Sequence, residues 1–112
     1  MRGPGAPAAA VVKLFLSVRL ALEFDAAKSD RNERERGLPF ERVAEFDFSM
    51  ARIWLDTRRA YSEPRYLAMG YLGCRLHVIC FVLGEHGLRV ISLRKANQRE
   101  GDRHGFPLTR DR

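Results

Sequence analysis

A run of four apolar segments separated by turn signals most constrains how this chain can fold. The segments are residues 51–56, 65–72, 74–83 and 88–94. Glycines that tolerate positive φ mark two of the turns, at Gly73 and in the stretch from Gly84 to Gly87. Strands that follow one another through short turns pair as antiparallel hairpins. The pattern therefore predicts an antiparallel sheet, and segment 74–83, apolar on both faces, is its expected central strand.

The rest of the chain predicts one more strand and three helices. Residues 18–24 are rich in strand formers. Asp25 can cap a following surface helix, which Gly37 can end in the left-handed conformation. A short second helix should follow Pro39, and the polar stretch 95–103 predicts a C-terminal helix that Gly101 weakens. The expected fold class is α+β.

The length of 112 residues predicts a single domain. Its expected bounds are residues 18–105. Residues 1–17, rich in Gly, Pro and Ala, form an expected flexible extension, and residues 106–112 an expected C-terminal tail. Two cations interrupt the apolar stretch near the N-terminus, and no apolar run is long enough to span a bilayer. Neither secretion nor membrane insertion is expected.

The charge of the chain favours a polyanionic partner. The sequence has 20 Lys and Arg against 14 Asp and Glu, which gives a net charge of +6. After Leu88 there are 7 cations and 3 acids, so +4 of this charge is C-terminal. Nucleic acid is the first expectation and an acidic protein the second.

Cysteine and histidine usage predicts neither a disulfide framework nor a metal site. Cys74 and Cys80 are too few and too close for disulfides, which is typical of a reduced, cytoplasmic protein. His77, His86 and His104 are not at ligand spacing from one another or from a cysteine. Structural roles are expected for His77 on its strand and His86 in its turn. No metal or other cofactor is expected.

Three stretches carry polar residues that a sheet does not need for its own stability. In the first, residues 25–32, Lys28 and Asn32 lie one helical turn apart and so share a helix face. That face can contact RNA through Lys28, or it can be the solvated side of a surface helix.

The second stretch is residues 56–65. Tyr61, Glu63 and Arg65 alternate, so in an extended chain they project from one side. A tyrosine, a carboxylate and a guanidinium can together serve as proton carrier, general base and phosphate clamp. The same residues can also form an ordinary cross-strand salt bridge with a tyrosine over it.

The third stretch, residues 91–100, ends a strand and begins a helix. Arg94 and Lys95 stand at the junction, and Arg99 follows one turn after Lys95, so the helix presents two cations together. Glu100 can orient one of them. Fixed, concentrated positive charge can bind phosphate, and it can equally dock an acidic partner.

These three stretches, together with residues 70–81, match four sequence signatures of one family. The pattern D-x-A-K-x-x-x-N is matched over residues 25–32, and D-x-R-x-x-Y-G-E-x-R over residues 56–65, with Ser62 in place of the Gly. Residues 70–81 keep Gly70, Gly73 and Arg75 of a third signature. The fourth, R-I-I-S-A-R-K-A-x-x-R-E, is the most specific and is matched over residues 89–100. From Phe24 to about His104 the chain resembles the BrnT family of type II toxins.

Two departures from the family pattern are visible. Where the family usually carries Lys-His-Gly after its first helix, this chain has Glu35, Arg36 and Gly37. The family's terminal R-E-x-x-x-Y is REGDRH here, so His104 stands near the usual Tyr position.

The resemblance implies a RelE-like fold, a twisted antiparallel sheet with two N-terminal helices packed on it and a short C-terminal helix. It also implies a metal-independent endoribonuclease that inhibits translation and uses the ribose 2′-hydroxyl as nucleophile. Such a reaction needs a base, cations on the phosphorane and an acid for the leaving oxygen. Glu63 is the candidate base, and Tyr61 or Lys95 the candidate acid. The candidate phosphate binders are Arg65, Arg94 and Arg99, and further RNA-binding candidates are Lys28, Arg58, Arg59 and Arg89.

The partner that the resemblance implies is a BrnA-type antitoxin with a ribbon-helix-helix part, assembled with the toxin as a heterotetramer. The competing interpretation is a non-catalytic or degenerate basic module that docks RNA or an antitoxin without cleaving anything.

Overall fold

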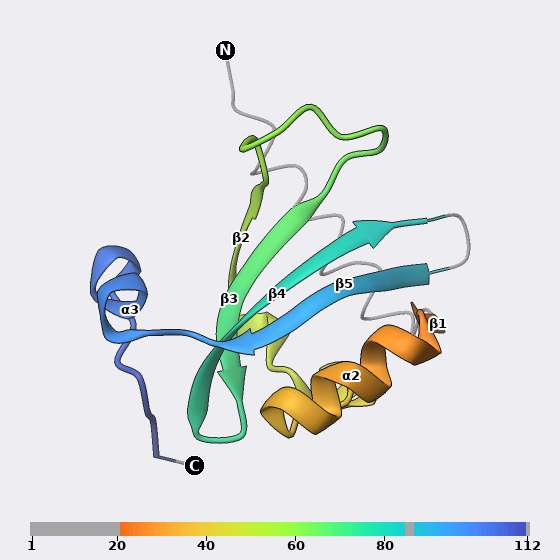
Figure 1. The fold of residues 1–112 in the computed structure, drawn as a ribbon. Helices are drawn as coiled ribbons and strands as arrows, with labels where there is room; N and C mark the ends of the chain where they lie inside the picture. Colours follow the sequence, from red (N-terminus) through yellow and green to blue (C-terminus); the bar gives the residue numbers. More distant parts are fainter. Residues whose placement is uncertain (1–20, 85–86, 112) are drawn as a thin grey trace.

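The computed structural model of the chain describes residues 21–84 and 87–111. Within these residues five strands form one sheet in the order β1-β5-β4-β3-β2 (Figure 1). The strands are β1 (Ala21–Phe24), β2 (Arg52–Leu55), β3 (Tyr66–Leu72), β4 (Arg75–Leu83) and β5 (Gly87–Lys95). The expected extension 1–17, the start of the first strand at 18–20 and the turn residue His86 lie outside the described residues.

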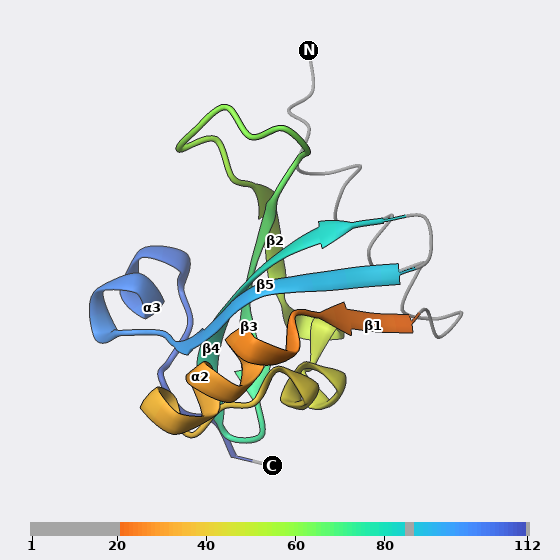
Figure 2. The ribbon, with the colours of Figure 1, turned by 45° about the vertical axis from the view of Figure 1, so that its right-hand side comes forward.

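The sheet is mixed. Strands β2 to β5 pair antiparallel through successive hairpins, as the turn signals predict. The expectation of a wholly antiparallel sheet is wrong at one edge, where β1 pairs parallel with β5 (Figure 2). At this edge Ala21 lies opposite Gly87, and a Cβ on Gly87 would come within 2.0 Å of the Ala21 carbonyl oxygen. A glycine at 87 therefore lets β1 approach.

The central position of β4 is confirmed, because its side chains are buried on both faces of the sheet. Ile79 and Phe81 belong to the larger apolar cluster, which the helical segments before β2 cover. Val78 points to the opposite face and belongs to a second cluster with Met69 and Ala96. Two separate cores thus hold the sheet, and each covers one face.

The first expected helix is confirmed as α2 (Ala26–Arg36). The Asp25 side chain accepts a hydrogen bond from the Lys28 amide, and Gly37 ends the helix in the left-handed conformation at φ 71°. In Figures 1 and 2, β5 runs between α2 and the C-terminal helix. None of the described helices is both long enough and apolar enough to cross a membrane.

The second expected helix is a 3₁₀ helix, η1 (Phe40–Glu45), and a short 3₁₀ turn, η2 (Phe48–Met50), follows it. Phe40, Val43 and Phe46 are buried, whereas Ala44 is exposed. The buried residues are three apart, which fits the three residues per turn of a 3₁₀ helix better than the 3.6 of an α-helix.

The C-terminal helix, α3 (Gln98–His104), begins with a capping box between Asn97 and Glu100. Gly101 permits the packing of this helix, because a Cβ there would lie 2.6 Å from the Phe106 carbonyl oxygen. The chain turns back after α3, and the Leu76 amide donates to the Leu108 carbonyl at 2.8 Å. The described part of the expected tail, 106–111, therefore packs on the sheet.

Candidate functional site

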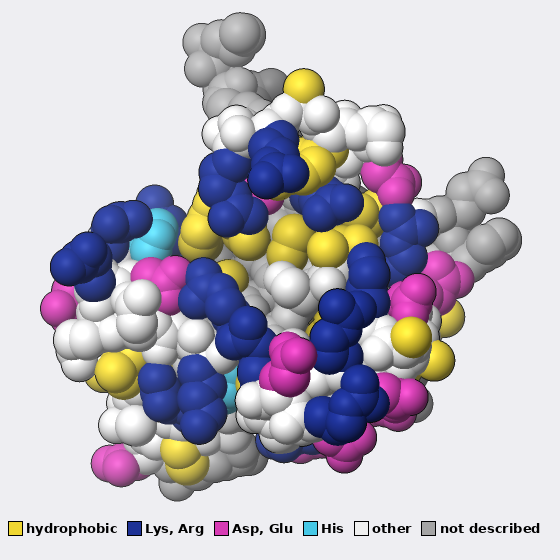
Figure 3. Space-filling view, in the orientation of Figure 1, with side chains coloured by type: hydrophobic (Ala, Val, Ile, Leu, Met, Phe, Trp, Pro, Cys, Tyr) yellow, Lys and Arg dark blue, Asp and Glu magenta, His cyan; other side chains and the backbone are white. Residues whose placement is uncertain are grey.

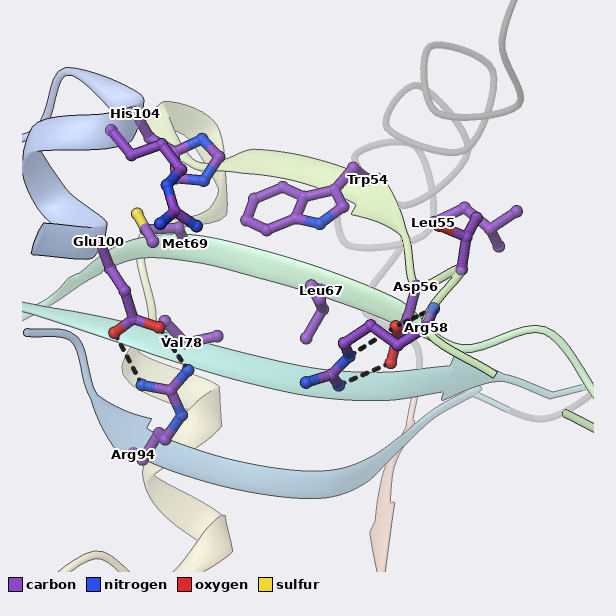
Figure 4. Close-up of a pocket in the computed structure, with 12 residues that line it drawn as sticks. Trp54, Leu55, Asp56, Arg58, Leu67, Met69, Val78, Arg94, Glu100 and His104 are labelled. Carbon is purple, nitrogen blue, oxygen red and sulfur yellow. Dashed lines mark hydrogen bonds and ion pairs between the residues drawn. The ribbon is translucent and has the colours of Figure 1, made fainter. Parts of the chain in front are cut away.

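A pocket of about 350 Å³ opens on the sheet face opposite the 3₁₀ segments. Leu67, Met69 and Val78, from β3 and β4, form its apolar floor. Its walls come from the end of β2 with the residues that follow it, and from β5 and α3. We call this cavity the sheet pocket. Figure 4 shows two ion pairs at its opposite ends and two aromatic rings along its upper edge.

The first ion pair joins Asp56 and Arg58. The buried Asp56 carboxylate accepts two hydrogen bonds from the Arg58 guanidinium, at 2.8 and 2.7 Å, and one from the Arg58 amide at 3.1 Å. These bonds hold the pKa of Asp56 far below its usual value. The Arg58 side chain is 68% exposed, so much of its guanidinium faces solvent at the pocket.

Of the three alternating residues in the 56–65 loop, two join this cluster. The Tyr61 hydroxyl donates to the Asp56 carboxylate at 2.9 Å, and the Arg65 guanidinium lies 4.5 Å from the centre of the Tyr61 ring. Glu63 is separate from them, because it forms an exposed ion pair with Arg89 on β5. The loop thus holds a tyrosine and two arginines around one buried carboxylate.

The second ion pair joins the end of β5 to α3. Arg94 donates to both carboxylate oxygens of Glu100, at 2.9 and 2.6 Å. This fork and the Asn97 amide lower the pKa of Glu100 from 4.5 to about 2. Glu100 thus orients Arg94, and not Lys95 or Arg99 as the sequence predicted. Both residues line the sheet pocket with Arg58, so the second and third predicted stretches meet there.

Two residues of the sheet pocket, Trp54 and His104, are not among the site residues predicted from the sequence. The rings of Trp54 on β2 and His104 on α3 stack with centroids 4.8 Å apart and planes 20° apart. Burial, together with the charges of Arg52 and Arg103, lowers the pKa of His104 below its usual 6.5. The imidazole is therefore mostly neutral at pH 7. Its spacing from Glu100 was an available signal, because residues four apart share a helix face.

The remaining predicted cations do not line the sheet pocket. Figure 3 shows Lys and Arg side chains spread around a central hollow on one face of the molecule. Lys28 borders a separate depression beside Ser92 on β5. Arg59 lies in another, beyond Tyr61, and Lys95 in a third, next to Arg36. Arg99 is exposed on α3.

Asn32 has a structural role. Its side-chain amide donates to the carbonyls of Leu38 at 2.8 Å and Leu93 at 2.9 Å, which ties α2 to β5. The Nδ1–H group of the buried His77 donates to the Arg75 carbonyl at 2.8 Å, in keeping with the structural role expected for it. Among residues 21–84 and 87–111, no group of three or more His, Cys, Asp or Glu could hold a metal ion.

The Arg94–Glu100 pair makes stability depend on pH. A carboxyl group whose folded pKa is lowered contributes stability above its unfolded pKa, and this contribution is lost as the pH falls toward the folded value. We expect the free energy of unfolding to fall by on the order of 1–3 kcal/mol between pH 4.5 and about 2 because of Glu100. Urea unfolding across this range measures the loss. In Glu100→Gln the loss should be smaller, and an unchanged pH dependence would contradict the assignment.

Comparison with known proteins identifies one family. A family model described as ribonuclease toxin, BrnT, of type II toxin–antitoxin system matches residues 24–100. The matched region contains both ion pairs of the sheet pocket and Trp54, and it ends four residues before His104. Neither the search of curated proteins nor the search of solved structures returned a match.

Proposed function

The chain belongs to the BrnT family of ribonuclease toxins of type II toxin–antitoxin systems, and we propose that it cleaves RNA at the sheet pocket without a metal ion. Family membership carries with it an RNA substrate and an antitoxin partner. The observation that supports the pocket as the site is that guanidinium groups and a neutral imidazole line one cavity over an apolar floor.

The proposed reaction uses the substrate's own nucleophile. The ribose 2′-hydroxyl attacks the adjacent phosphorus, a base takes its proton, and the bond from phosphorus to the 5′ oxygen breaks. An acid then gives the 5′ oxygen a proton. The products are a 2′,3′-cyclic phosphate and a 5′-hydroxyl. The 2′-hydroxyl is already next to the phosphorus, so the protein has to supply proton transfer and positive charge.

Arginines supply the positive charge in this proposal. Arg58, Arg94 and Arg103 line the sheet pocket, and Arg65 lies beside it over Tyr61. Each paired guanidinium uses only part of its five N–H groups on its carboxylate, so the others can bind phosphate oxygens. Arg99, one residue before Glu100, remains a proposed binder at the rim.

The proton acceptor is proposed to be His104 or Glu63. Asp56 and Glu100 are poor acceptors, because hydrogen bonds from arginine lower the pKa of both carboxyl groups. His104 is in the pocket and largely neutral at pH 7, which suits a base. Glu63 would first have to leave Arg89. We retain Tyr61 and Lys95 as the proposed acids, and Tyr61 already donates a hydrogen bond beside the pocket.

The proposal extends to the fold and the partner. The antiparallel strands β2 to β5, with helical segments on one face and α3 on the other, are compatible with a RelE-like arrangement. We propose a BrnA-type ribbon-helix-helix antitoxin, joined to the toxin in a heterotetramer. The many exposed cations support an antitoxin surface that is acidic where it covers them.

Cleavage is expected to continue in excess EDTA and to leave 2′,3′-cyclic phosphate ends. The assay incubates the purified chain with labelled RNA and identifies the ends by mass spectrometry. A substrate with 2′-deoxyribose at the cut site should be inert, because it lacks the nucleophile. Loss of activity on chelation, or 3′-hydroxyl products, would contradict the mechanism. RNA binding without cleavage, also in the presence of translating ribosomes, would favour the non-catalytic binding module instead.

A further inference from the structure

One wall of the sheet pocket is aromatic and has no part in the proposed binding of phosphate. Trp54 and His104 stack along its upper edge, and the half-buried Leu67 lies on the floor below them (Figure 4). Indole and imidazole rings beside an apolar floor provide flat surfaces with little charge. A backbone phosphate gains nothing from such surfaces, whereas an aromatic base gains stacking energy.

The hydrogen-bond acceptors of the pocket are occupied to a greater extent than its donors. The Glu100 oxygens accept from Arg94 and the Asn97 amide, and the Asp56 oxygens accept from Arg58 and Tyr61. The acceptors are thus occupied, while the guanidinium groups keep free donors. A ligand that fits this pocket has a flat ring and a neighbouring anion.

We propose that Trp54, with His104 behind it and Leu67 below, binds a nucleobase of single-stranded RNA while Arg58 or Arg94 contacts the adjoining phosphate. This inference rests on the proposed binding of RNA at the sheet pocket. The base must come from an unpaired segment, because the bases of a duplex are stacked on one another and cannot reach a side-chain platform. The volume of about 350 Å³ is within the ~300–1,000 Å³ of small-molecule sites.

Fluorescence of the wild-type chain tests the inference directly, since Trp54 is the single tryptophan of the sequence. The probes are a 2′-O-methyl hexanucleotide, which cannot be cleaved through the 2′ oxygen, and an abasic oligomer with the same backbone and charge. At one fixed salt concentration the hexanucleotide should change the Trp54 emission, and it should bind more tightly than the abasic oligomer. Equal affinity for both probes, or no change in emission with the hexanucleotide, overturns the proposal.

Substitutions separate stacking from support of the fold. Trp54→Ala should weaken binding of the hexanucleotide on the order of tenfold or more, since stacking of one base on an aromatic side chain is of that size. Because this variant has no tryptophan, the anisotropy of dye-labelled probes measures affinity for all variants. The affinity of Trp54→Ala for the abasic oligomer should not change, and Trp54→Phe should keep most of the binding. Met50→Ala, at an exposed residue outside the pocket, is the control.

Two further outcomes are informative. If Trp54→Ala weakens both probes equally while its circular dichroism is native, Trp54 only shapes the pocket and the inference is wrong. If the base effect is present but unmodified RNA is not cut, the proposed ribonuclease activity fails at this site and the base-binding inference stands.

Discussion

Replacing His104 by Gln is expected to lower the rate of RNA cleavage by about 10²–10⁴-fold, the usual contribution of a positioned proton acceptor. Glutamine keeps much of the size of the side chain and its hydrogen bonding but cannot take up a proton. Single-turnover cleavage of a labelled RNA measures the effect. Glu63→Gln is the matched variant, because it removes the competing candidate base. If Glu63→Gln shows the large loss and His104→Gln does not, Glu63 is the base.

The pH profile provides a second readout for His104. Its lowered pKa means that the neutral, proton-accepting form predominates above a pH somewhat below 6.5. The cleavage rate should therefore rise with pH through that region and level off near pH 7. This rise should be absent in His104→Gln. A purely structural role for the imidazole would lower the rate of the variant but leave the rise in place.

Replacing Arg94 by Ala is expected to lower cleavage by about 10²–10³-fold, as is usual when one group that stabilises transition-state charge is lost. It should also lower the free energy of unfolding by on the order of 1 kcal/mol, because Glu100 would lose its partner in a partly buried place. Arg94→Lys keeps the charge but loses the bidentate hydrogen bonding of the guanidinium, and it should retain only part of the wild-type activity. Cleavage assays and urea unfolding measure the two effects.

Arg99→Ala is the matched control for the effect of Arg94→Ala on stability. Arg99 is exposed on α3, so its removal should change stability by less than about 0.5 kcal/mol. Any loss of activity then reports lost contact with RNA. If Arg94→Ala cleaves RNA as well as the wild type, the proposed phosphate-binding role of Arg94 is wrong.

Sequence reasoning succeeded where the signal was local. The capping residues Asp25 and Gly37 predicted where α2 begins and ends, and the apolar faces of residues 74–83 predicted the central strand. It failed at the parallel pairing of β1 with β5. These strands are more than sixty positions apart, and no local sequence pattern indicates whether such strands pair parallel or antiparallel. The sequence predicted the second helix but not that it is a 3₁₀ helix, in which the buried residues are three positions apart.

The same limit applies to the site. Arg94 was a candidate because concentrated positive charge is visible in the sequence, and Arg58 because it matches a family signature. Both line the sheet pocket. The stacking of Trp54 on His104 was not predicted, because it joins residues fifty positions apart. The alternation of Tyr61, Glu63 and Arg65 suggested one common group. The loop instead places Glu63 against Arg89 on β5, which offers an opposite charge.

The fold-back after α3 sets the order in which the site can form during synthesis. Leu108 accepts from Leu76, and Arg110 donates to the Cys74 carbonyl and pairs with Asp47, so this segment anchors the far end of α3 to the β3–β4 hairpin. A nascent chain that has not yet released residues 106–110 lacks this anchor. The sheet can form before then, whereas the wall that His104 contributes is secured only after residues 106–110 have left the ribosome and packed against the β3–β4 hairpin.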